Sequence, residues 1–315
     1  MTAPLLLDPH GRRIRKLRVS LTDACNHRCF YCMPANPDFM PRTALLEPSS
    51  LIKICGHLAR LGITHLRITG GEPFMRKEFD EIADGLSALP VAKIGLTTNG
   101  LLLSEKLGFL QKIGLLNLNV SLDSLDADRF RLITRTGKLA AVLDAIYTAR
   151  DMGFTVKVNV VVARGVNDAE IPAFARWSAV NRIPVRFLEL MKIGPAIADH
   201  ERQYLPAAEM LDRLRSEHEL VPVLQERDST AFVYRTPEGA ELGFIASESK
   251  PFCGGCSRLR LSATGKLRSC LMREDGIDLA SRDSREYPTL LMQVMAGKPT
   301  GRIEQINEAM NRIGG

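Results

Sequence analysis

Six of the seven cysteines in this 315-residue chain fall into two groups whose spacing suits metal-cluster chemistry. The groups are Cys25, Cys29 and Cys32, spaced C-x3-C-x2-C, and Cys253, Cys256 and Cys270, spaced C-x2-C-x13-C. Four thiolates close a tetrahedral zinc site or hold every iron of a cubane cluster. Three thiolates leave one metal position open to a further ligand. The two groups therefore predict two reactive metal centres that face one cavity.

Disulfides and structural zinc are the alternatives to iron–sulfur clusters. Six paired cysteines are typical of small secreted domains, and this chain is long enough to bury a large core. A zinc site would need a fourth ligand such as His27 or His57, and the x3 spacing differs from the C-x2-C pairs that dominate zinc sites. The pair Cys253 and Cys256 does have zinc-like spacing, so zinc remains the main rival there. Cys55 falls in a predicted helix, where a buried apolar role is expected.

Short apolar runs alternate with amphipathic helical patterns along the first two thirds of the chain. Strands are predicted at 18–21, 65–69, 92–97, 116–121, 155–162 and 184–190. Helices are predicted at 49–61, 78–89, 104–112, 139–152 and 168–180. Successive strand–helix units indicate an α/β fold with a parallel sheet. Polar or glycine-rich residues follow nearly every strand, as in barrels whose active sites lie in the loops after the strands.

The pattern changes after about residue 203, which predicts two parts, 1–203 and 204–315. The second part contains one predicted helix, 207–217, and short strands at 221–224, 231–234 and 241–245. It also carries the second cysteine group. We expect a smaller α+β region that covers the open side of a partial (βα)6 TIM-like barrel, a fold that the family resemblance described below also favours.

Basic residues at strand positions predict an anion site. Arg18, Arg67 and Lys157 lie on strands that point to the same mouth of the barrel, and Arg258 and Arg260 alternate on one face of an extended segment. A triphosphate carries about four negative charges and prefers several Arg or Lys donors. The basic stretch 12–16 has two readings, a solvated surface or a polyanion contact.

The first cysteine group, with Tyr31 before its last cysteine, resembles the signature of the radical S-adenosylmethionine (SAM) superfamily. The second group narrows the resemblance to the GTP 3′,8-cyclase family of molybdenum cofactor biosynthesis (protein A), from about Arg12 to the end of the chain. The resemblance implies a [4Fe–4S] cluster on each group, with SAM on the open iron of the first and a purine nitrogen on that of the second. It implies SAM contacts at Tyr31, Gly71, Ser121 and Met191. It implies GTP contacts at Arg18, Arg67, Thr97, Lys157, Arg258 and Arg260, and an active-site tail formed by Gly314 and Gly315.

The implied activity is that of a radical SAM lyase that converts GTP to 3′,8-cyclo-7,8-dihydro-GTP. The implied partners are GTP, an electron donor of the flavodoxin or ferredoxin type, and a downstream pterin-forming enzyme, with a homodimer as one alternative. A peptide-modifying radical SAM enzyme and a non-catalytic, RNA-binding zinc protein are the rival functions, although aromatic residues make up only 6% of the chain. No apolar stretch is long enough to span a bilayer, so we expect a cytoplasmic protein that binds neither membrane nor nucleic acid.

Overall fold

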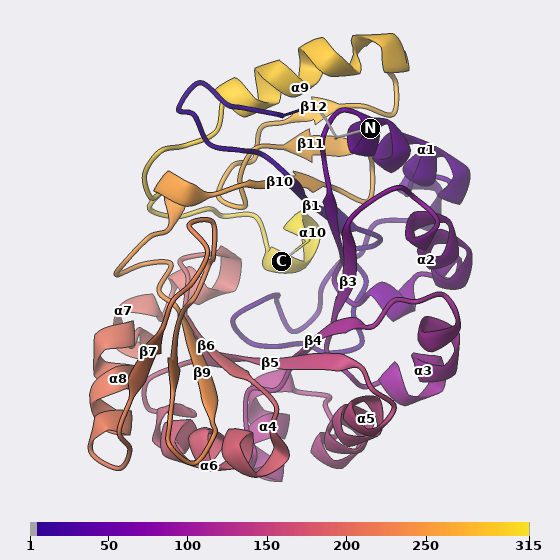
Figure 1. Cartoon of the computed structure of the whole chain (residues 1–315). Coiled ribbons are helices and arrows are strands. Elements are labelled where there is room, and N and C mark those ends of the chain that lie inside the picture. Colours follow the sequence, from indigo (N-terminus) through magenta and orange to yellow (C-terminus); the bar gives the residue numbers. More distant parts are fainter. Residues whose placement is uncertain (1–4, 315) are drawn as a thin grey trace.

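Six parallel strands form the frame of the molecule in the computed structural model, which describes residues 5–314 (Figure 1). They are β1 (Lys16–Ser20), β2 (His65–Thr69), β3 (Lys93–Thr98), β4 (Asn117–Ser121), β5 (Thr155–Val162) and β6 (Val185–Glu189). Each strand pairs in parallel with the next along the chain. The predicted strands are confirmed to within two residues at each end, and their parallel order fits the expected partial (βα)6 barrel.

Helices cover the outer face of these strands (Figure 1). They are α1 (Pro48–Arg60), α2 (Phe79–Ser87), α3 (Leu103–Lys112), α4 (Ala127–Thr134), α5 (Leu139–Asp151) and α6 (Ile171–Asn181). In α1 the buried residues Leu51, Ile54, Cys55 and Leu58 recur at helical spacing, and Cys55 is fully buried as expected. The short helix α4 was not predicted; its first turn is capped by Asp126, whose carboxylate accepts the main-chain N–H of Arg129.

The second part of the chain extends the sheet at both edges. Its elements are α7 (His200–Gln203), α8 (Ala207–Arg215), β7 (Val221–Val223), β8 (Phe232–Arg235), β9 (Glu241–Ile245), β10 (Arg258–Leu261), β11 (Lys266–Arg268), β12 (Ile277–Asp278), α9 (Tyr287–Ala296) and α10 (Met310–Ile313). Within residues 5–314 all strands form one twelve-stranded sheet in the order β12-β11-β10-β1-β2-β3-β4-β5-β6-β9-β8-β7. Both β9 and β10 pair in parallel with a barrel strand, β6 and β1 respectively.

Single-turn 3₁₀ helices punctuate the loops. They are η1 (Arg42–Ala44), η2 (Pro73–Met75), η3 (Asp168–Glu170), η4 (Gly194–Ile197), η5 (Cys253–Gly255) and η6 (Ser284–Glu286). Both η2 and η5 belong to loops that the sequence singles out for chemistry. None of the helices in the described range is long and apolar enough to cross a membrane.

The barrel strands have one apolar and one polar face. In β5 the buried valines Val156, Val158, Val160 and Val162 alternate with half-buried residues that include Lys157 and Asn159. A parallel strand with both faces in an apolar core reads as a continuous hydrophobic run. Here only the outer face packs on helices, and the polar inner face lines the barrel. Figure 1 shows α10 in the centre of this ring of strands.

Candidate active site between two cysteine triads

The first cysteine loop follows β1 and is fixed by the glycine-rich loop after β2. The N–H of Gly71 donates to the carbonyl of Thr22 at 2.7 Å, and the N–H of Glu72 donates to that of Ala24 at 2.8 Å. A Cβ on Gly71 would lie 2.4 Å from the carbonyl oxygen of Asp23. Only glycine permits this approach. The glycine-rich loop after β2 therefore packs directly on the main chain that precedes Cys25.

The buried carboxylate of Glu72 links this unit to the end of β3. It accepts the hydroxyl of Thr98 at 2.9 Å and the main-chain N–H of Asn99 at 2.7 Å. The side-chain amide of Asn99 in turn lies 3.7 Å from the sulfur of Cys25 and donates to Asn26 at 2.7 Å. Burial raises the pKa of Glu72 to about 7. Sequence reasoning missed Asn99 as a neighbour of the thiol, although its place directly after β3 is the signal that could have found it.

The first triad faces a cavity, here called the first-triad cavity, which Cys25, Cys29 and Cys32 line together. Burial raises the pKa of Cys25 to about 11 and that of Cys32 to about 12. At neutral pH these thiols would therefore be protonated unless a metal replaced the protons. Thiolate ligands bind metal in their deprotonated form, so buried thiols gathered at one cavity fit a bound cluster.

The residues predicted to contact SAM are partly gathered here. Tyr31, Gly71 and Ser121 line the first-triad cavity, and the hydroxyl of Tyr31 donates to Asp123 at 2.6 Å. Met191 lines the adjoining cavity of the second triad. Both cavities are lined by Arg18, Leu188, Thr230, Ile245 and Met310, so they adjoin each other.

Several buried polar atoms on the first-triad cavity lack a hydrogen-bond partner within residues 5–314. They are Nε2 of His27, Oγ1 of Thr97, Oδ1 of Asn159 and Oδ1 of Asn311. Buried polar atoms are nearly always paired in folded proteins. Four unpaired atoms on one cavity wall therefore indicate a polar ligand. Thr97, predicted to contact GTP, is among them.

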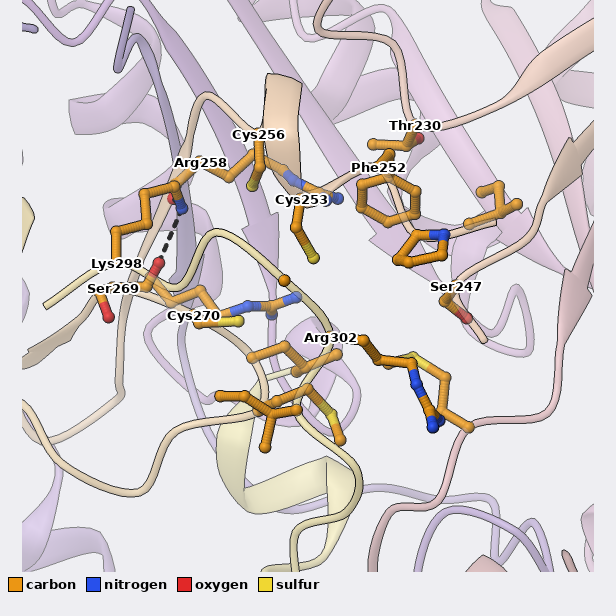
Figure 2. Close-up of a pocket in the computed structure, with 18 of the residues that line it drawn as sticks. Thr230, Ser247, Phe252, Cys253, Cys256, Arg258, Ser269, Cys270, Lys298 and Arg302 are labelled. Carbon is orange, nitrogen blue, oxygen red and sulfur yellow. Dashed lines mark hydrogen bonds between the residues drawn. The ribbon is translucent and has the colours of Figure 1, made fainter. Parts of the chain in front are cut away.

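The second triad lies on the adjoining cavity, here called the second-triad cavity (Figure 2). Cys253 begins η5, Cys256 follows it, and Cys270 comes two residues after β11. Although burial alone would raise the pKa of Cys256, the charges of Arg258 and Lys298 lower it to about 6. The guanidinium of Arg258 also lies 4.7 Å from the centre of the Phe252 ring. Phe252 thus gives the triad an apolar cover, and the two cations favour the thiolate of Cys256, while burial raises the pKa of Cys253.

The strand register brings the predicted phosphate ligands into one row. Arg18 on β1 stands between Arg260 on β10 and Arg67 on β2, because each of these pairs shares a register position. Burial and the charges of Arg260 and Arg258 hold the pKa of Arg18 well below its usual range. Burial lowers the pKa values of Arg67 and Arg260 to about 10. Cations forced together in this way favour a bound polyanion.

Arg67 and Lys157, two of the predicted phosphate ligands, line neither the first-triad nor the second-triad cavity. Each stands two residues before a residue that lines the first-triad cavity, Thr69 on β2 and Asn159 on β5. The guanidinium of Arg67 donates to the carbonyl of Leu96 at 3.0 Å. Their contact with the substrate remains a prediction.

Arg186 on β6 is a further inner cation that the sequence analysis did not name. It lines the first-triad cavity, and its charge lowers the pKa values of Arg67 and Lys157, which burial lowers first. No ion pair within residues 5–314 involves Arg186 or any of the five predicted basic ligands. The signal was present: Arg186 alternates with buried Val185 and Phe187, as an inward residue of the barrel does.

The predicted tail enters the barrel. Gly314 has a φ of +78°, and a Cβ at this position would lie 2.7 Å from the Cβ of Ser20 on β1. Its carbonyl accepts a hydrogen bond from Arg260. The N–H of Met310 donates to the carbonyl of Cys32 at 3.1 Å. Gly315, the second predicted tail residue, lies outside the described residues.

Within residues 5–314 no group of three or more His, Cys, Asp or Glu side chains is arranged to hold a single metal ion. In an iron–sulfur cubane each cysteine binds a separate iron, so the ligands surround the cluster. The fit to such clusters rests on the donors: two sets of three thiols, which line two adjoining cavities.

Comparisons with known proteins define the class of protein first. Residues 19–178 match the family model of the radical SAM superfamily, and residues 183–301 match that of Molybdenum Cofactor Synthesis C. The fold resembles that of SuiB from Streptococcus suis, solved with bound SAM, with a TM-score of 0.62 and 13% identity over 91% of this chain and 68% of that one. The chain is thus a radical SAM protein with an auxiliary-cluster region.

The relatives narrow the class. A GTP 3′,8-cyclase from Synechocystis is 44% identical over 98% of this chain and 95% of its own. Those from Geobacter sulfurreducens and Aquifex aeolicus are 42% and 38% identical over at least 89% of both chains. The chain belongs to the GTP 3′,8-cyclase family, whose cofactors are SAM and two [4Fe–4S] clusters. A peptide-modifying function has only the fold-level likeness to SuiB, also solved with a precursor peptide, at 12% identity.

Proposed function

We propose that this protein is a radical SAM lyase that converts GTP to 3′,8-cyclo-7,8-dihydro-GTP in molybdenum cofactor biosynthesis. The observation that carries the proposal is a pair of adjoining cavities, each lined by one thiol triad and both lined by Arg18, whose register partners on the neighbouring strands are Arg260 and Arg67. A nucleoside triphosphate fits this arrangement, because it presents a base at one end and about four negative charges at the other.

Each part of the cavity has a separate task. Cys25, Cys29 and Cys32 hold the cluster that, together with SAM, supplies hydrogen-atom abstraction from the substrate ribose. Tyr31 and Gly71 border the space for SAM, and Ser121 and Met191 lie at its edges. The main contribution of the chain is to hold the ribose and the base close together and to exclude water.

The second triad and the basic residues orient the substrate. Cys253, Cys256 and Cys270 would hold the second cluster, which would offer an open iron to the purine, and Phe252 lines the same cavity with an apolar ring. Arg18, Arg67, Lys157, Arg258 and Arg260 bind the triphosphate, together with Thr97 and Arg186. The tail residues Gly314 and Gly315 close the site, with Gly314 fixed through Arg260.

The wider setting follows from this chemistry. We infer that residues 1–203 activate SAM, that residues 204–315 bind the second cluster, and that both parts contribute contacts to the substrate. A flavodoxin- or ferredoxin-like donor supplies the electron, and a pterin-forming enzyme consumes the product. The reaction belongs in the reducing cytoplasm, where thiols stay available to iron. A homodimer is compatible with this scheme.

The test separates the two triads. Anaerobic reconstitution should give about eight irons per chain, about four for each cubane. Cys25→Ala should abolish SAM cleavage, whereas Cys270→Ala should abolish cyclisation and leave some uncoupled SAM cleavage. Arg260→Ala should weaken GTP binding with no loss of iron. An iron-free protein with full cyclase activity, or equal loss of both activities in Cys270→Ala, would refute the assignment.

A further inference from the structure

Lys298 is a buried cation at the second triad to which no role is yet attached. It follows α9 and is only 3% exposed. Its Nζ donates to the carbonyl of Arg258 at 2.6 Å and to that of Ser269 at 2.8 Å. Arg258 comes two residues after Cys256, and Ser269 directly precedes Cys270. One ammonium group therefore joins the two segments that carry two of the three thiols (Figure 2).

The main chain of the same residue is joined to the third thiol through Arg12. The guanidinium of Arg12 donates to the carbonyl of Lys298 at 3.0 Å and to that of Cys253 at 2.9 Å. Arg12 is itself 6% exposed and pairs with Asp8 at 2.6 Å. The reading of residues 12–16 as a solvated or polyanion-binding stretch is thus wrong for Arg12, whose donors are used inside the protein. All three cysteine segments meet at residue 298.

The charge of Lys298 is not neutralised by a carboxylate within residues 5–314, where no ion pair includes it. A buried ammonium is costly unless it has hydrogen bonds and an anionic partner. Two carbonyls take two of its three donors. Lys298 also lines the second-triad cavity together with Cys253, Cys256 and Cys270. Thiols bind a cluster as thiolates, so a cluster held by this triad would supply the anionic partner.

We propose that Lys298 is a positioning residue of the second triad: it fixes the spacing of the cysteine segments and places a positive charge beside the cluster that they hold. This inference rests on the proposed function. A fixed positive charge stabilises the more negative, reduced state of a cluster and so raises its reduction potential. Lys298 should also slow the release of iron, because it ties the ligand segments together.

The experiment uses the full chain, anaerobically reconstituted, with the first triad changed to alanine so that only the second site contributes. Lys298→Met removes the charge and its hydrogen bonds. The equilibrium constant for one-electron reduction of the cluster, followed by electron paramagnetic resonance, should fall at least about tenfold. This corresponds to a reduction potential about 59 mV more negative. Iron release to a chelator should become roughly tenfold faster. Lys298→Arg, which keeps the charge, should restore most of the potential.

Lys266→Met is the matched control. Lys266 lies on β11 shortly before Cys270, but its side chain donates to the carbonyl of Glu274 on the exposed side. A potential and a release rate in Lys298→Met equal to those of this control would overturn the inference. Faster release with an unchanged potential would overturn its electrostatic part. If Lys298→Met retains no iron, the reduction potential is measured instead in Lys298→Gln, which also lacks the positive charge. A wild-type second triad that binds no cluster would instead refute the proposed function.

Discussion

Gly71→Ala tests whether the glycine-rich loop holds the first cysteine loop in place. An alanine Cβ at this position would lie 2.4 Å from the carbonyl oxygen of Asp23 and 2.5 Å from that of Ala24. Both atoms belong to the main chain, so no side-chain rotation relieves the overlap. Overpacking of this kind costs about 1–3 kcal/mol. Because the displaced carbonyls directly precede Cys25, the same movement should displace that thiol.

Two measurements check this prediction. Urea unfolding of the metal-free protein should show a loss of about 1–3 kcal/mol in the free energy of unfolding. Anaerobic reconstitution should recover about half of the wild-type iron, because only the second cubane site stays intact. The control is Gly108→Ala in α3, where a Cβ would meet no atom within 4 Å. That change should stabilise the protein by about 0.5–1 kcal/mol. Wild-type stability and full iron in Gly71→Ala would refute the packing argument.

Two further predictions concern charged groups. Arg186→Met should weaken equilibrium binding of GTP by about 10- to 100-fold, since hydrogen bonds to charged groups contribute about 1.5–3 kcal/mol. The iron content should not change. An unaltered affinity for GTP would remove Arg186 from the substrate site. Asp228→Asn should lower the free energy of unfolding at neutral pH by about 1 kcal/mol, because Asp228 binds Arg15 at 2.8 Å and Lys16 at 2.9 Å. Against the opposing effect of burial, these partners lower the pKa of Asp228 below its unfolded value of about 3.9. The stabilisation from Asp228 is therefore complete above about pH 4 and is lost as the pH falls further. The difference in free energy of unfolding between variant and wild type, measured by urea unfolding at several pH values, should shrink below about pH 4. A constant difference would contradict the ionic origin.

The barrel could be predicted from sequence because its strands and helices have distinct periods. The apolar runs gave six strands, and the polar residues after them located the active end of the sheet. The edges of the sheet could not be predicted. Pairing of β10 with β1 joins residues from opposite ends of the chain, and no local pattern specifies such a partner. The helix α9 was also not predicted, although its buried residues Leu290, Leu291, Val294 and Met295 recur at helical spacing.

The site was predictable where chemistry restricts the residue type. Thiols that bind a cluster must be cysteine, so both triads could be named in advance. Gly71 was named as a SAM contact through the family resemblance, and the structure adds a packing reason for glycine at this position. Arg186, Asn99 and Lys298 belong to common residue types, and only their place in the fold brings them to the site. Their residue type alone therefore could not identify them. Arg12 shows the reverse case: its surroundings in sequence suggest an exposed surface, while the fold buries it against the second triad.

The parallel pairing of β10 with β1 also bears on how the protein is made. The cysteines of the first loop leave the ribosome early, at the end of a strand whose outer edge is still bare. That edge acquires its partner only after nearly all of the chain has been synthesised, and non-local pairing of this kind forms slowly. During translation the nascent barrel therefore exposes an unpaired strand next to reactive thiols.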